Sequence, residues 1–83
     1  MMEVTIQELK NLLKTVAPGK NSENLEVDVS LLDQGYDSLD FLDLFFNIEE
    51  KYNIRISDED TTKLITLNDF VSYISDRLGQ ASS

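Results

Sequence analysis

Apolar residues at helical spacing mark the first expected element, near the start of the chain. The stripe consists of Ile6, Leu9, Leu13 and Val16, with Leu12 beside it. Thr5 and Glu8 have the spacing of a capping box, in which Thr5 accepts a backbone N–H and Glu8 bonds back to the helix start. Pro18-Gly19 ends the pattern. We therefore expect a first helix that begins at Thr5 and ends before Pro18.

The second pattern is apolar over a wider arc and predicts a helix from Asp37 or Ser38 to about Tyr52. One line on this helix is expected to face the core: Phe41, Phe45, Ile48 and Tyr52. A second line lies beside the acids Asp43 and Glu50 and consists of Leu39, Leu42 and Phe46. Both lines are buried if the helix is central in its domain. Alternatively, the second line is an exposed apolar strip bordered by acids, as in a docking surface.

Two further helices are expected in the second half of the chain. The acidic run from Ser57 to Asp60 predicts a short, weak helix that reaches about Leu64. A regular stripe then predicts a longer one, with Gly79 as its stop and residues 79–83 as a frayed tail: Leu67, Phe70, Val71, Ile74 and Leu78. Residues 19–36 are rich in turn formers and predict an ordered loop, with a single turn at residues 30–33.

These patterns together predict an all-α fold, a four-helix bundle with a long first loop and a short third helix. With 83 residues we expect one domain, spanning residues 1–83. The N-terminal residues lack the basic and apolar regions of a secretory signal. The densest apolar stretch, residues 41–46, is too short to span a bilayer. We therefore expect a cytoplasmic protein that does not insert into membranes.

The net charge of −9 is concentrated in one segment. Residues 21–50 contain no Lys or Arg and nine acids, whereas the rest of the chain has seven acids and seven bases. Such a segment repels nucleic acid and attracts basic protein surfaces. Acidity alone favours the simpler interpretation, a solvated face that keeps a small protein soluble.

Several kinds of chemistry find no support in the sequence. The chain has no Cys and no His, which excludes the usual zinc sites and the commonest nucleophile and proton-transfer groups. The run that begins at Asp58 fails as a calcium loop because Lys63 stands where glycine is required. Gly19, Gly35 and Gly79 are too far apart to form a phosphate-binding loop. We expect no metal site and no autonomous catalysis.

Ser38 lies at the expected start of the second helix, inside the acidic segment. The run Asp37-Ser38-Leu39, with the Leu-x-x-x-Gly approach from Leu31 and the helical pattern through Ile54, strongly resembles the acyl carrier proteins. The resemblance covers almost the whole chain. It implies a non-catalytic carrier in which 4′-phosphopantetheine, transferred from coenzyme A by a phosphopantetheinyl transferase, is esterified to Ser38. Its thiol then carries acyl groups as thioesters in fatty-acid, polyketide or related lipid biosynthesis.

The resemblance also implies roles for other positions. Asp37 would assist the transferase. A docking face for acyl-handling enzymes with basic patches would consist of Leu39, Asp40, Leu42, Asp43, Phe46, Glu49 and Glu50. The core, part of it lining a cleft for the acyl chain, would consist of Phe45, Ile48, Tyr52, Leu64, Phe70 and Ile74. We expect the carrier to be a monomer.

The chain departs from the usual carriers at several positions. Tyr36 stands where a small residue is usual, Ser57 replaces a proline, and three phenylalanines make the second helix bulky: Phe41, Phe45 and Phe46. These departures predict a specialised carrier with a smaller or reshaped cleft. Two alternatives remain. One is an aminoacyl or peptidyl carrier, which would tend to be less acidic on the second helix; the other is an acidic helical adaptor that carries nothing.

Overall fold

The computed structural model describes residues 3–82, and all of the regular structure in that part is helical. The predicted all-α fold with four α-helices is therefore confirmed. The elements, in chain order, are α1 (Ile6–Val16), η1 (Ser22–Asn24), η2 (Leu32–Gln34), α2 (Ser38–Tyr52), α3 (Asp58–Thr61) and α4 (Leu67–Ser82). None of these helices combines the length and apolar character that a membrane span requires.

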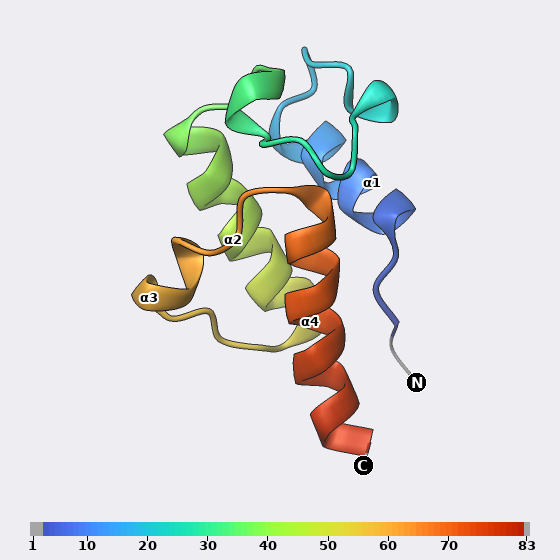
Figure 1. The fold of residues 1–83 in the computed structure, drawn as a ribbon, viewed down its shortest axis with the longest axis vertical. Helices are drawn as coiled ribbons and strands as arrows, with labels where there is room; N and C mark the ends of the chain where they lie inside the picture. The colour runs from blue at the N-terminus through green and yellow to red at the C-terminus, as the bar shows by residue number, and fades with distance from the viewer. Residues whose placement is uncertain (1–2, 83) are drawn as a thin grey trace.

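Helices α1, α2 and α4 make up the body of the molecule, and the short α3 lies at its edge (Figure 1). The long connection between α1 and α2 covers one end. Helix α1 contacts both α2 and α4, and Phe70 of α4 packs on the Phe41 and Phe45 rings of α2. The largest fully buried side chains are Leu9, Leu13, Leu31, Leu44, Ile48, Leu67, Phe70 and Ile74. One continuous core thus joins the three long helices and the loop.

The two halves of the capping box predicted at the start of α1 have different outcomes. At the start of α1, Thr5 Oγ1 accepts the backbone N–H of Glu8 at 3.1 Å, as expected. The Glu8 carboxylate does not complete a capping box, because it turns to α2 and accepts the Tyr52 hydroxyl at 3.3 Å. A complete box is found instead at the start of α2, between Asp37 and Asp40. The Glu8 prediction is wrong because a partner distant in sequence takes up its side chain.

Two other predicted boundaries and the predicted number of turns in the loop need correction. Gly79 does not stop the last helix, which continues to Ser82, so the tail predicted from residue 79 is helical through residue 82; Ser83 lies outside the described residues. A glycine inside an exposed helix costs only about 1 kcal/mol, which is too little to end it. Helix α3 ends at Thr61 rather than near Leu64. The loop contains two short 3₁₀ turns, η1 and η2, where one was expected.

Candidate functional site

Ser38 is the first residue of α2, and its side chain is exposed. Asp37 caps the helix by accepting the Asp40 backbone N–H at 3.0 Å, and Asp40 accepts the Asp37 N–H at 3.1 Å. This reciprocal pair fixes the direction in which α2 begins and leaves the Ser38 hydroxyl outside the cap. The helix start therefore presents Ser38 to solvent on a rigid element.

The approach to Ser38 is shaped by a tight turn after η2. Gly35 adopts a φ of 101°, which side-chain-bearing residues rarely tolerate, and the Tyr36 N–H then donates to the Leu31 carbonyl at 3.1 Å. Leu31 is fully buried, and its own N–H donates to the Ile65 carbonyl at 3.0 Å. The loop is thereby held to the segment that follows α3. As a result, Leu32 and Ile65, which are far apart in sequence, line the same cavity.

Lys20 lies beside the start of α2 although it precedes the acidic segment in sequence. Its Nζ is 2.6 Å from Asp40 Oδ2 and 5.2 Å from the centroid of the Tyr36 ring. The hydrogen bond from Lys20 lowers the pKa of the Asp40 carboxyl, and the same contact raises the pKa of Lys20. One acid next to Ser38 is therefore neutralised within the chain.

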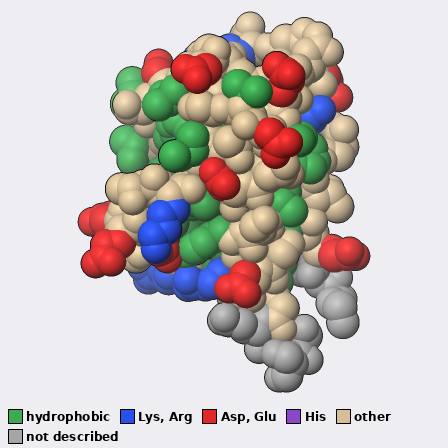
Figure 2. Space-filling view, in the orientation of Figure 1, with side chains coloured by type: hydrophobic (Ala, Val, Ile, Leu, Met, Phe, Trp, Pro, Cys, Tyr) green, Lys and Arg blue, Asp and Glu red, His purple; other side chains and the backbone are tan. Residues whose placement is uncertain are grey.

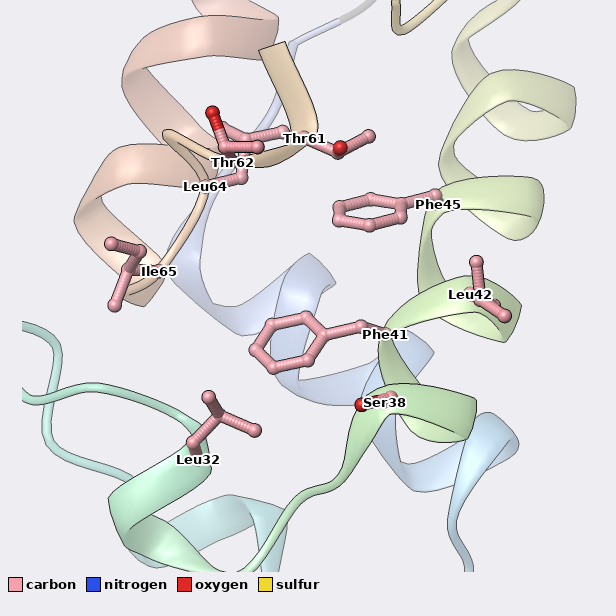
Figure 3. A pocket seen from close by; sticks show the side chains of 9 residues that line it. All are labelled: Leu32, Ser38, Phe41, Leu42, Phe45, Thr61, Thr62, Leu64 and Ile65. Atoms are coloured by element: carbon pink, nitrogen blue, oxygen red, sulfur yellow. The ribbon is translucent and has the colours of Figure 1, made fainter. Parts of the chain in front are cut away.

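A cavity of about 480 Å³ opens next to Ser38, between α2 and the segment that contains α3. Figure 3 shows the side chains that line it, which come from both sides of this gap. The lining residues are Leu32, Ser38, Phe41, Leu42, Phe45, Thr61, Thr62, Leu64 and Ile65. The two threonine hydroxyls donate to backbone carbonyls, Thr61 to Asp58 at 2.6 Å and Thr62 to Glu59 at 2.7 Å. The cavity is therefore mainly apolar, with Ser38 at its edge.

Three aromatic rings separate the cavity from the deep core. The centroids of Phe41 and Phe45 are 6.0 Å apart, and Phe70 lies 6.4 Å from the first and 5.8 Å from the second. Phe70 is fully buried and is not part of the cavity lining, whereas Phe41 and Phe45 line it. Phe41 and Phe45 thus form the α2 side of the cavity, with Phe70 packed behind them.

Comparison with known proteins fits this geometry. Residues 7–74 match the family model described as the phosphopantetheine attachment site. The acyl carrier protein of Thermotoga maritima is 39% identical over 66 residues, which cover 70% of this chain and 82% of the relative. That of Desulforapulum autotrophicum is 36% identical over 67 residues, covering 80% and 87%. This chain belongs to the acyl carrier protein family.

The second apolar line of α2 is exposed. This agrees with the interpretation in which Leu39, Leu42 and Phe46 form an exposed apolar strip. Leu39 is 71% exposed, Leu42 62% and Phe46 60%, so they do not belong to the core of this acyl carrier. Asp43 and Glu50 are exposed beside them. Figure 2 shows apolar side chains at the surface on the side where η2 and the start of α2 lie, with acidic side chains around them. The interpretation that buried both lines is wrong.

Two acids predicted on this face have partners inside the chain. Glu49 is half-buried, and its Oε2 accepts the Ile56 N–H at 2.8 Å, which fixes the connection after α2. Asp40 is paired with Lys20. Of the four predicted acids, Asp43 and Glu50 remain exposed with no ion pair among the described residues.

The six residues that the resemblance places in the core, with part of them lining a cleft, are located as expected. Those fully or almost fully buried are Ile48, Tyr52, Leu64, Phe70 and Ile74. Phe45 is half-buried, packs against the core and lines the cavity, as Leu64 also does. Lys20, Leu32 and Ile65 were not predicted at the site. The folded loop brings Lys20 and Leu32 there, and the bond from Leu31 to the Ile65 carbonyl brings Ile65. The Leu31-to-Gly35 spacing was the single signal near Leu32.

Proposed function

We propose that Ser38 is the residue that carries 4′-phosphopantetheine, and that the protein delivers acyl groups to partner enzymes rather than acting as a catalyst. The observation that carries this proposal is the position of Ser38, exposed at the start of α2 and at the edge of a mainly apolar cavity. An arm attached there lies next to a space that accepts an apolar chain.

The residues around Ser38 fit the group. A phosphodiester at the first turn of a 15-residue helix is favoured by the unpaired backbone N–H groups and the helix dipole. Lys20 offsets the charge of Asp40, which would otherwise oppose a nearby anion. When bound, the arm supplies the thiol that the chain lacks. Asp37 is exposed and keeps the helix start in place, and we assign it a role in recognition by the transferase.

We assign docking of partner enzymes to the strip of Leu39, Leu42 and Phe46 with Asp43 and Glu50. An exposed apolar strip bordered by unpaired acids fits a surface with apolar contacts and a basic rim. We further propose that the protein acts as a monomer in the cytoplasm. The apolar lining supports an acyl cargo over an aminoacyl one, because an ammonium group would lose its hydration there.

The attachment site is tested by incubating the purified chain with coenzyme A and a broad-specificity phosphopantetheinyl transferase and measuring its mass. We expect a gain of one phosphopantetheine that disappears in Ser38→Ala. The matched control is Ser72→Ala, which changes an exposed serine on α4 and should leave the gain intact. If the mass gain persists in Ser38→Ala, the arm is attached to another residue. If the unaltered chain gains no mass, the alternative of an acidic helical adaptor that carries nothing is favoured.

A further inference from the structure

Helix α3 and the residues that follow it form one wall of the cavity, and α3 has little packing of its own. It has four residues, none of which is buried. Thr61 and Thr62 nevertheless line the cavity, followed by Leu64 and Ile65. A short element without buried side chains belongs to the least stable part of a fold. The contacts that hold α3 in place therefore determine how far this side of the cavity opens.

A hydrogen-bonded cluster connects this wall to α4. The Tyr73 hydroxyl donates to Asp60 Oδ2 at 2.8 Å, and Arg77 Nη1 donates to the Tyr73 oxygen at 2.9 Å. Arg77 Nη2 donates to the Arg55 carbonyl at 2.8 Å, in the connection between α2 and α3. Two side chains of α4 thus bind both α3 and the segment that leads into it.

The local interactions of α3 do not replace this cluster. Ser57 caps the helix by accepting the Asp60 N–H at 3.2 Å, and Lys63 pairs with Asp60 at 3.6 Å, but both contacts lie within residues 57–63. They stabilise the turn without joining it to another helix. The segment is also anchored before α3 by the Ile56 N–H on Glu49 and after it by buried Leu64, but neither contact involves a residue of α3 itself.

We propose that Tyr73 is a positioning residue that holds α3 against α4 and so controls opening of the cavity next to Ser38. The part of this inference that concerns an acyl group rests on the proposed function; the part that concerns α3 does not. Loss of the Tyr73 hydroxyl would leave Asp60 and Arg77 without their shared partner, while the ring would keep its packing. Helix α3 then separates from α4 more often, which opens the cavity, while the packing of the core is unchanged.

The test is amide hydrogen exchange on the full chain without the arm. Tyr73→Phe should speed exchange in residues 58–65 about tenfold, the factor that corresponds to one net hydrogen bond to a charged group. Tyr52→Phe is the matched control, because the Tyr52 hydroxyl also donates to a carboxylate, that of Glu8, but joins α2 to α1. It should leave exchange in residues 58–65 unchanged. Asp60→Ala, which removes the acceptor of the Tyr73 hydroxyl, should also speed exchange in residues 58–65.

Two results would overturn the inference. One is unchanged exchange in residues 58–65 of Tyr73→Phe. The other is an equal increase throughout the chain, which would show general destabilisation instead of a local role.

A second measurement addresses the cargo, using an arm loaded with an octanoyl thioester and attack by hydroxylamine. Tyr73→Phe should raise the rate of cleavage, and Tyr52→Phe should not. If Tyr73→Phe and the unaltered chain are cleaved at equal rates, Tyr73 does not protect the cargo, even if amide hydrogen exchange in residues 58–65 is faster. If Ser38 fails to accept the arm, the proposed function fails, and the exchange result still decides the role of Tyr73.

Discussion

Glu49 and Glu50 are neighbours in sequence with different surroundings. Glu49 accepts a backbone N–H and is half-buried, whereas Glu50 is exposed. The same contrast separates Phe45, which lines the cavity, from Phe46, which is 60% exposed. A helix turns about 100° per residue, so adjacent positions face different surroundings. Side-chain type alone therefore does not separate the exposed positions of α2 from the half-buried ones, whereas position around the helix does.

The difference between buried and exposed rings predicts different effects of truncating Phe70 and Phe46. Phe70→Ala removes a fully buried ring that contacts Phe41 and Phe45, and should lower the free energy of unfolding by about 3–5 kcal/mol. Phe46→Ala removes a mostly exposed ring and should change it by less than about 0.5 kcal/mol. Urea denaturation followed by circular dichroism measures both. Similar losses in the two variants would show that Phe46 belongs to the core.

At the scale of elements, the starts of helices were easier to predict than their ends. The start of α2 follows from Asp37 and Asp40, whose side chains act within one turn, and the structure begins α2 at Ser38 as expected. Its end at Tyr52 is reinforced by Asn53 in a left-handed conformation, with a φ of 55°. At Gly79 the helical backbone simply continues. A glycine stops a helix only where the chain adopts a positive φ.

Two glycine substitutions test this distinction. Gly79→Ala should stabilise the protein by up to about 1 kcal/mol, because alanine favours helix and nothing lies near the added methyl group. Gly35→Ala should destabilise it, since φ is 101° there and alanine is strained in that region. Thermal unfolding compares the two variants with the unaltered chain. A loss of stability in Gly79→Ala would indicate that α4 ends before residue 79.

The loop shows where prediction from sequence reaches its limit. Turn formers and apolar residues predicted an ordered connection, and η2 lies close to the single expected turn. The side chain of Gln34 bonds to the backbone of Glu26 and Val29, and Leu31 bonds to Ile65. These contacts join positions separated by five to several tens of residues. Periodicity carries no information about such partners, so Leu32 and Ile65 were not expected at the cavity.

For the whole molecule, the distribution of charge governs association. Lys20 folds back onto Asp40, so the acidic segment is less negative at the start of α2 than its sequence suggests. Asp43 and Glu50 remain exposed along the strip. Charges at the rim of an interface mainly affect the association rate and its salt dependence. We therefore expect partner binding to be fast, weak and sensitive to salt.

Charge reversal tests this expectation. Asp43→Lys and Glu50→Lys should each slow association with the phosphopantetheinyl transferase several-fold at low salt, and the difference should shrink as salt screens the charges. Glu26→Lys makes the same change in net charge at an exposed loop position and serves as the control. Stopped-flow measurements give the rates. An equal effect from Glu26→Lys would show that net charge, and not this face, controls docking.

The three tyrosines give the molecule an internal set of spectroscopic probes. Tyr36 lies under Lys20 near the start of α2, Tyr52 bonds to Glu8 of α1, and Tyr73 bonds to Asp60 of α3. Each ring thus reports on a different contact between segments. The chain has no Trp, so no indole signal masks them. Ring resonances assigned to each tyrosine would show, without any added label, which contact loosens first when the protein binds a partner.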